Sequence, residues 1–134
     1  MSAASFESLS DADIVEVELI ALDGESHRVW LLVDSGFTGS SSLVLPEELS
    51  RFIRADLPET ETSGALRGLQ RRGWVTARVP GLETQRTLIA IFTDVTVLSL
   101  PDSIAGMVGL NFLRQFSRWG AERNDAGWRF ELRD

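Results

Sequence analysis

The tripeptide Asp34-Ser35-Gly36 has the residue types of a catalytic carboxylate held in a turn. It follows an apolar run from Trp30 to Val33, and a second apolar run begins at Leu43. A carboxylate at the end of a buried strand can act as a general acid or base toward water. Asp, Ser and Gly also make ordinary surface turns. The residues alone therefore leave a catalytic acid and a plain turn as alternatives.

A second glycine motif, "MVGLNFL", centres on Gly109 and follows Asp34 by 75 positions. Apolar residues flank this glycine on both sides. The mixed apolar spacing from Leu110 to Phe116 predicts a short amphipathic helix directly after it. The distance between the two motifs leaves room for a hairpin and a returning strand.

The composition offers few other catalytic groups. The chain has no Cys and a single histidine, and all 13 of its basic residues are Arg. His27 follows the turn signal Asp23-Gly24 and is expected to be an exposed hairpin residue. Without a ligand set or a G-x-S-x-G elbow, neither a metal site nor a Ser-His-Asp triad is predicted. We therefore expect no metal and no cofactor.

The charge balance argues against nucleic acid as a partner. The 134-residue chain carries 20 acidic residues and a net charge of -7, whereas nucleic-acid binders usually present basic patches. No apolar run approaches the roughly 20 residues of a membrane span, and the N-terminus lacks the features of a signal peptide. A cytoplasmic protein without a membrane partner is expected.

Short strands dominate the pattern along the chain. Residues 1–10 are expected to be a flexible lead-in, and residues 11–134 a single domain. Residues 54–64 look like a loop, and two strand-like arms are expected around Gly68 and Gly73. Many short strands with two short helices predict a small, closed all-β barrel or a sandwich. The expected elements are strands near 14–20, 29–33 and 87–92, helices near 46–53 and 110–116, and a C-terminal hairpin turning at 124–127.

Taken together, these motifs resemble those of aspartic proteases. Val33-Asp34-Ser35-Gly36 is similar to their signature of an apolar residue followed by Asp, Thr or Ser, and Gly. The continuation Phe37-Thr38-Gly39, with the apolar run ending in Pro46, is similar to bacterial and archaeal retropepsin-like proteases. The Gly109 motif resembles the family's later apolar-Gly-x-Asp/Asn-apolar element. The resemblance covers most of residues 13–116 and implies a retropepsin-like acid-protease barrel.

This resemblance implies an aspartic endopeptidase that acts as a homodimer on a peptide or protein substrate. The chemistry needs two carboxylates that share one proton, with a water molecule between them. Such a pair titrates as a unit. The chain has one Asp-Ser-Gly and is too short for two lobes, so two copies of Asp34 would have to meet across a twofold axis.

The resemblance also assigns roles to neighbouring residues. The Ser35 hydroxyl would bond across the interface, and the Gly36 N–H would point at a carboxylate. Thr38 would support the active-site loop, and Gly109 would allow close packing behind it. A mobile flap that covers the substrate would contain Gly68 and Leu69.

Two departures from the family keep other functions open. Phe37 stands where related enzymes often have Ser or Ala, and the chain has no Tyr for a pepsin-type flap. The first alternative is a non-catalytic peptide-binding or dimerisation module on the same fold. The second is a small all-β domain in which Asp34 occupies a plain turn. The role of the hairpin at 117–133 also stays open.

Overall fold

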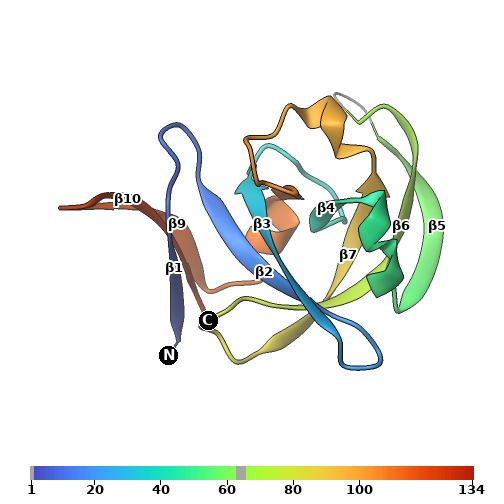
Figure 1. The fold of residues 1–134 in the computed structure, drawn as a ribbon, viewed down its shortest axis with the longest axis horizontal. Coiled ribbons are helices and arrows are strands. Elements are labelled where there is room, and N and C mark those ends of the chain that lie inside the picture. Colours follow the sequence, from blue (N-terminus) through green and yellow to red (C-terminus); the bar gives the residue numbers. More distant parts are fainter. Residues whose placement is uncertain (1, 63–65) are drawn as a thin grey trace.

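Two antiparallel-rich sheets make up the computed structural model, which describes residues 2–62 and 66–134 (Figure 1). The larger sheet has the strand order β2-β3-β8-β4-β7-β6-β5, and the smaller one has the order β1-β10-β9. The larger sheet consists of β2 (Ile14–Ile20), β3 (Ser26–Val33), β4 (Leu43–Pro46), β5 (Ala55–Thr62), β6 (Gly68–Arg78), β7 (Gln85–Thr93) and β8 (Gly106–Val108).

Pairing between β2 and β6 closes six of these strands into a barrel. The seam is short, with Glu18 opposite Arg78 and Ile20 opposite Thr76. Glu18 is buried, and its carboxylate contacts the guanidinium groups of Arg78 and, at 3.6 Å, Arg28. A closed barrel leaves none of these six strands as a free edge. The predicted closed all-β barrel is confirmed.

Strand β8 enters between the two strands that flank the Asp34 loop. It runs parallel to β3 and antiparallel to β4, with Val33 opposite Val108 and Leu43 opposite the same residue. Gly106 permits this insertion, because a β-carbon there would lie 2.0 Å from the carbonyl oxygen of Val44. The ends of β3, β8 and β4 are thereby brought together.

Side chains alternate between the inside and the outside of the barrel, as the pleat requires. Leu31, Leu43, Leu45 and Val108 point inward and are fully buried. In the described residues, three short helices connect the strands: η1 (Glu47–Phe52) and η2 (Val95–Leu98), which are 3₁₀, and α1 (Leu110–Leu113). None of the helices in the described part of the chain combines the length and apolarity needed to cross a membrane.

The expected flexible lead-in is wrong, because residues 3–7 form a strand. β1 (Ala3–Glu7) pairs with β10 (Gly127–Arg133), which in turn pairs with β9 (Arg118–Asn124). Ala4 and Phe6 point inward and are buried, and Phe6 meets Trp30 edge-to-face with ring centroids 5.7 Å apart. Only two inward side chains mark this strand, too few to stand out in a small and polar segment. The expected C-terminal hairpin is confirmed.

The loop expected at residues 54–64 is also wrong, since β5 spans most of it. This strand pairs only with β6, and most of its side chains are exposed. An outer strand of this kind lacks the apolar alternation that marks a strand in sequence. The two arms expected around Gly68 and Gly73 are instead one continuous strand, β6. Thr62 pairs with Gly68, so β5 and β6 form an antiparallel hairpin.

Candidate active site

Asp34 lies directly after β3, in a turn built by its own backbone. Its N–H donates to the carbonyl of Val108 at 3.0 Å, and the Phe37 N–H donates to the Asp34 carbonyl at 3.1 Å. The Gly36 N–H donates to the Asp34 carboxylate at Oδ1, also at 3.0 Å. The side chain is half-buried. One carboxylate oxygen is thus held in place while the group still reaches solvent.

The segment after β8 holds this turn in place by hydrogen bonds. The Gly109 N–H donates to the Ser42 carbonyl at 3.0 Å, and the Leu110 N–H donates to the Phe37 carbonyl at 2.9 Å. The Ser42 hydroxyl donates to Asn111 Oδ1. Both ends of the loop from Phe37 to Ser42 are therefore bonded to the start of α1.

Packing makes glycine necessary at position 109. A β-carbon there would lie 2.5 Å from the Phe37 ring and 2.6 Å from the Phe37 carbonyl oxygen. The ring of Phe37 is half-buried and packs toward Val44, Ile91 and Met107. Phe37 therefore anchors the loop to the barrel wall.

The two hydroxyl residues of the turn have no partner within the described chain. Ser35 and Thr38 are exposed, and neither makes a hydrogen bond to another described residue. Both hydroxyls can donate and accept. They are accessible to a substrate or to a second protein chain.

An apolar surface lies outside the barrel next to the turn. Its buried members are Val44, Leu66, Ile91 and Met107, and the partly buried residues packed against them are Leu32, Phe37, Val95 and Leu98. Leu32 lies two residues before Asp34, and Met107 two before Gly109. The outward positions of β3, β4, β7 and β8 thus form an apolar wall beside the carboxylate.

The hairpin of β5 and β6 contributes Leu66 to this surface. Leu66 is 4% exposed, whereas Leu69 is 66% exposed and points away from the cluster. Gly68 is the first residue of β6, with φ +92, and is exposed. Arg72 also ties the hairpin to the active-site loop, because its side chain donates to Ser40 Oγ at 3.4 Å. Part of the expected flap falls on residues 63–65, outside the described residues.

The structure therefore brings together Asp34, Ser35, Gly36, Thr38 and Gly109 at one end of β3 and β8. It places Gly68 and Leu69 on a hairpin that reaches the same region through Leu66. Ser42, Asn111 and Leu66 also lie at this site, and no role is predicted for them from sequence. The Asn111 position in the second motif was the one available signal for the polar pair.

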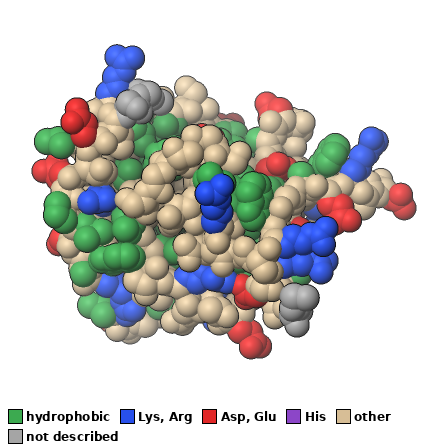
Figure 2. Space-filling view, turned by 180° about the vertical axis from the view of Figure 1, so that it is seen from behind, with side chains coloured by type: hydrophobic (Ala, Val, Ile, Leu, Met, Phe, Trp, Pro, Cys, Tyr) green, Lys and Arg blue, Asp and Glu red, His purple; other side chains and the backbone are tan. Residues whose placement is uncertain are grey.

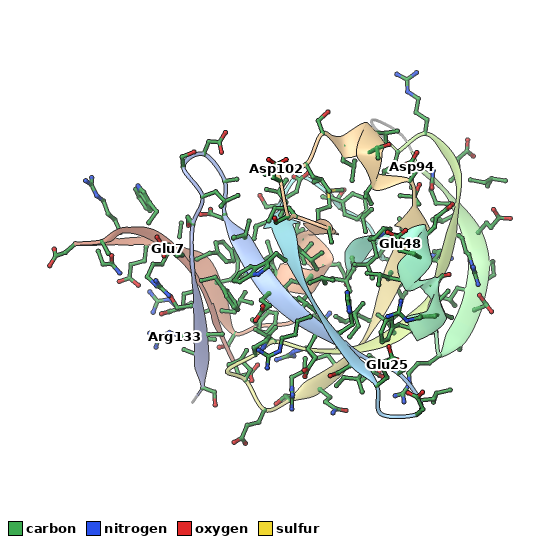
Figure 3. The ribbon with its side chains drawn as sticks, viewed as in Figure 1. Glu7, Glu25, Glu48, Asp94, Asp102 and Arg133 are labelled. Atoms are coloured by element: carbon green, nitrogen blue, oxygen red, sulfur yellow. The ribbon has the colours of Figure 1, made fainter. Side chains whose placement is uncertain are left out.

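Two acidic side chains lie at this end of the barrel. Asp94 and Asp102 lie on the loops above the strand ends, as Figure 3 shows. Hydrogen bonds from the Thr96 hydroxyl, at 2.7 Å, and the Thr96 N–H, at 3.0 Å, lower the pKa of Asp94. Asp94 thereby begins η2, which carries Val95 and Leu98 of the apolar surface. Among residues 2–62 and 66–134, no group of three or more His, Asp or Glu is placed to hold a metal ion.

Comparison of the chain with protein-family models and with curated proteins finds no match.

Proposed function

We propose that the protein is an aspartic-type endopeptidase that works as a homodimer. The observation that carries this proposal is the Asp34 turn. Its carboxylate is half-buried, receives the Gly36 N–H at 3.0 Å and lies beside an apolar wall. A plain surface turn needs neither the hydrogen bonds from Gly109 and Leu110 to the loop nor the apolar surface next to it.

The second carboxylate would come from Asp34 of a second copy. One ionised and one protonated carboxyl group would hold a water molecule between them. The ionised group takes a proton from the water while the other donates a hydrogen bond to the scissile carbonyl. The exposed Ser35 hydroxyl is available to bond across the interface and orient the partner's loop.

The substrate would bind as an extended peptide over the apolar wall. The half-buried Leu32, Phe37 and Val95 offer contacts for alternate side chains, and the β5–β6 hairpin offers a covering element through Leu66. Extended peptides commonly bind through main-chain hydrogen bonds, with side chains in alternate pockets. No cofactor and no metal is part of this mechanism.

The test compares three proteins on a diverse peptide library from about pH 4 to 7: wild type, Asp34→Asn and Asp102→Asn. Asparagine keeps the oxygen that accepts the Gly36 N–H, so Asp34→Asn should fold normally. Asp102→Asn removes an exposed carboxylate from the same end of the barrel. We expect cleavage by wild type and Asp102→Asn, and none by Asp34→Asn.

The same samples are examined by analytical ultracentrifugation across the assay concentrations. A wild-type protein that is dimeric and binds peptides without cleaving them would replace this proposal with a non-catalytic peptide-binding module. A protein that stays monomeric yet cleaves peptides would overturn the two-copy site. Equal cleavage by Asp34→Asn would remove Asp34 from the chemistry.

A further inference from the structure

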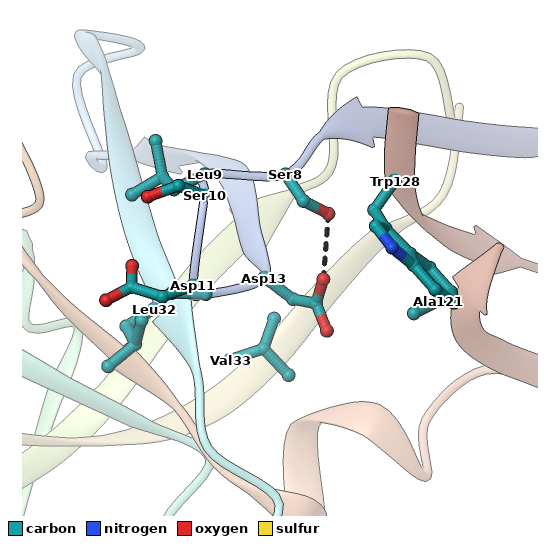
Figure 4. A pocket seen from close by; sticks show the side chains of 10 residues that line it. Ser8, Leu9, Ser10, Asp11, Asp13, Leu32, Val33, Ala121 and Trp128 are labelled. Carbon is teal, nitrogen blue, oxygen red and sulfur yellow. Dashed lines mark hydrogen bonds between the residues drawn. The ribbon is translucent and has the colours of Figure 1, made fainter. Parts of the chain in front are cut away.

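A cleft of about 490 Å³ separates the β1–β2 turn from the β9–β10 hairpin (Figure 4). Leu32 and Val33 line its inner end, and Trp128 and Ala121 line the hairpin side. Residues Ser8 to Asp13 form the opposite wall. Val33 is the last residue of β3, so the cleft lies beside the strand that leads into Asp34.

Two carboxylates in this cleft have no cationic partner. The Ser8 hydroxyl donates to Asp13 Oδ1 at 2.8 Å, which fixes that side chain toward Trp128, and Asp11 lies on the Leu32 side (Figure 4). In the described part of the chain, no Arg pairs with Asp11 or Asp13. Several carboxylates elsewhere do have such partners: Glu16, Glu18, Glu25, Asp56, Glu131 and Asp134.

The Trp128 side of the cleft is exposed because the β9–β10 hairpin projects beyond the barrel (Figures 1 and 2). Trp128 alternates with Phe130 and Leu132 on the face of β10 that turns toward the core. Those two are buried, but Trp128 is 54% exposed. An indole that is more than half exposed at a core-facing position offers its ring to the cleft.

We propose that this cleft binds the guanidinium group of an arginine side chain in an extended polypeptide. A guanidinium can stack on an indole face and donate two hydrogen bonds to a carboxylate at the same time. Asp13 and Trp128 face one another across the cleft, and Leu32 and Val33 offer apolar contact to the methylene stem. A metal ion fits less well, since the cleft holds two carboxylates rather than a ligand set of three.

This assignment rests on the proposed function for its substrate class. A peptide lying over Asp34 would pass close to Val33 and place one side chain in the cleft. The peptidase would then favour sequences with arginine near the scissile bond. Binding of the arginine itself does not depend on catalysis.

The test is an NMR titration of the Asp34→Asn protein, which binds without cleaving. The probe is a short Ala/Ser peptide with one central arginine, and its matched control carries citrulline, which has nearly the same shape without the charge. We expect the arginine peptide to shift the Trp128 indole N–H and the amides of Ser8 to Asp13. The citrulline peptide should leave them unchanged.

The affinity is then measured in two further variants. The double variant Asp11→Asn/Asp13→Asn keeps the oxygen that accepts the Ser8 hydroxyl. It should weaken binding of the arginine peptide at least about tenfold, which corresponds to about 1.4 kcal/mol. Glu47→Gln with Glu48→Gln removes the same charge from exposed positions on η1 and should have little effect.

Equal binding of the two peptides, or shifts confined to other residues, would overturn the proposal. The double variant Asp11→Asn/Asp13→Asn could also bind the peptide with unchanged affinity but no longer form a dimer. That result would overturn the proposal, because the cleft would then hold an arginine of the second copy. Specific arginine binding by a wild-type protein that cuts nothing would remove the proposed peptidase and leave the cleft assignment standing.

Discussion

Gly109 and Phe37 are in such close contact that no side chain fits between them. A β-carbon on Gly109 would lie 2.5 Å from Phe37 Cδ2 and 2.6 Å from the Phe37 carbonyl oxygen. The Leu110 N–H donates to that same carbonyl at 2.9 Å. The position of the Asp34 loop is therefore set by backbone packing from a segment 75 residues later in the chain.

Replacing Gly109 with Ala should destabilise the protein by about 1–3 kcal/mol, because the loop must move to admit the methyl group. The free energy of unfolding in urea measures this cost. Gly120→Ala is the matched control, because nothing lies within 4 Å of a β-carbon there. If both variants unfold at the same urea concentration, the loop is not held by this contact.

Replacing Arg78 with Met should cost about 1–2 kcal/mol of folding free energy, because it leaves Glu18 with a weaker charge partner at the barrel seam. The Glu18 side chain is 9% exposed and that of Arg78 39%, so solvent screens part of the pair. Arg71→Met breaks the exposed pair with Asp56 and should cost at most about 0.5 kcal/mol. Equal costs in urea denaturation would show that burial of Glu18 contributes nothing.

Replacing Leu66 with Ala should cost about 2 kcal/mol, since Leu66 is 4% exposed and packs on Val44, Ile91 and Met107. Leu69→Ala, at a position 66% exposed, should change stability by less than about 0.5 kcal/mol. If the proposed peptidase activity is found, Leu66→Ala should also raise KM. A larger effect of Leu69→Ala on either quantity would contradict the placement of this hairpin.

Replacing Thr96 with Val should raise the pKa of Asp94 toward its ordinary value, because the hydroxyl is the main cause of the lowered pKa. A carboxylate with a lowered pKa in the folded state stabilises the protein above its unfolded-state pKa. That stabilisation is lost as the pH falls through the folded-state pKa. The stability difference between Thr96→Val and wild type should therefore shrink in acid. Carboxyl-carbon NMR follows the titration, with Thr87→Val as the control.

Inward-facing apolar runs could be predicted from sequence, and outer strands could not. β2, β3 and β7 bury one or both faces, and each contains several apolar residues close together in the sequence. β5 pairs with one neighbour and has mostly exposed side chains, so it looked like a loop. β1 is recognisable only through β10, a partner more than a hundred residues away.

The turn around Asp34 could also be predicted from a local sequence pattern, but the hydrogen bonds that hold it could not. The tripeptide and the Gly109 motif each have a local pattern, and the structure places them together. The Ser42–Asn111 hydrogen bond joins side chains 69 positions apart, so the place of Asn111 in its motif does not identify Ser42 as the partner. The apolar surface is equally nonlocal, because its members come from β3 and the loop after it, β4, the β5–β6 hairpin, β7, η2 and β8.

The pairing of β1 with β10 affects how the chain can reach its folded state. Arg129 bonds to Ser5 across a separation of 124 positions, and the barrel is closed by pairings that are also far apart in sequence. Loops this long must be closed before their contacts stabilise anything, and folds dominated by distant contacts form slowly. During synthesis, residues 3–7 have to wait until residues 127–133 have emerged from the ribosome. The side chains of Ala4 and Phe6, buried in the folded protein, remain exposed to solvent over that interval, when uncovered apolar surface favours aggregation.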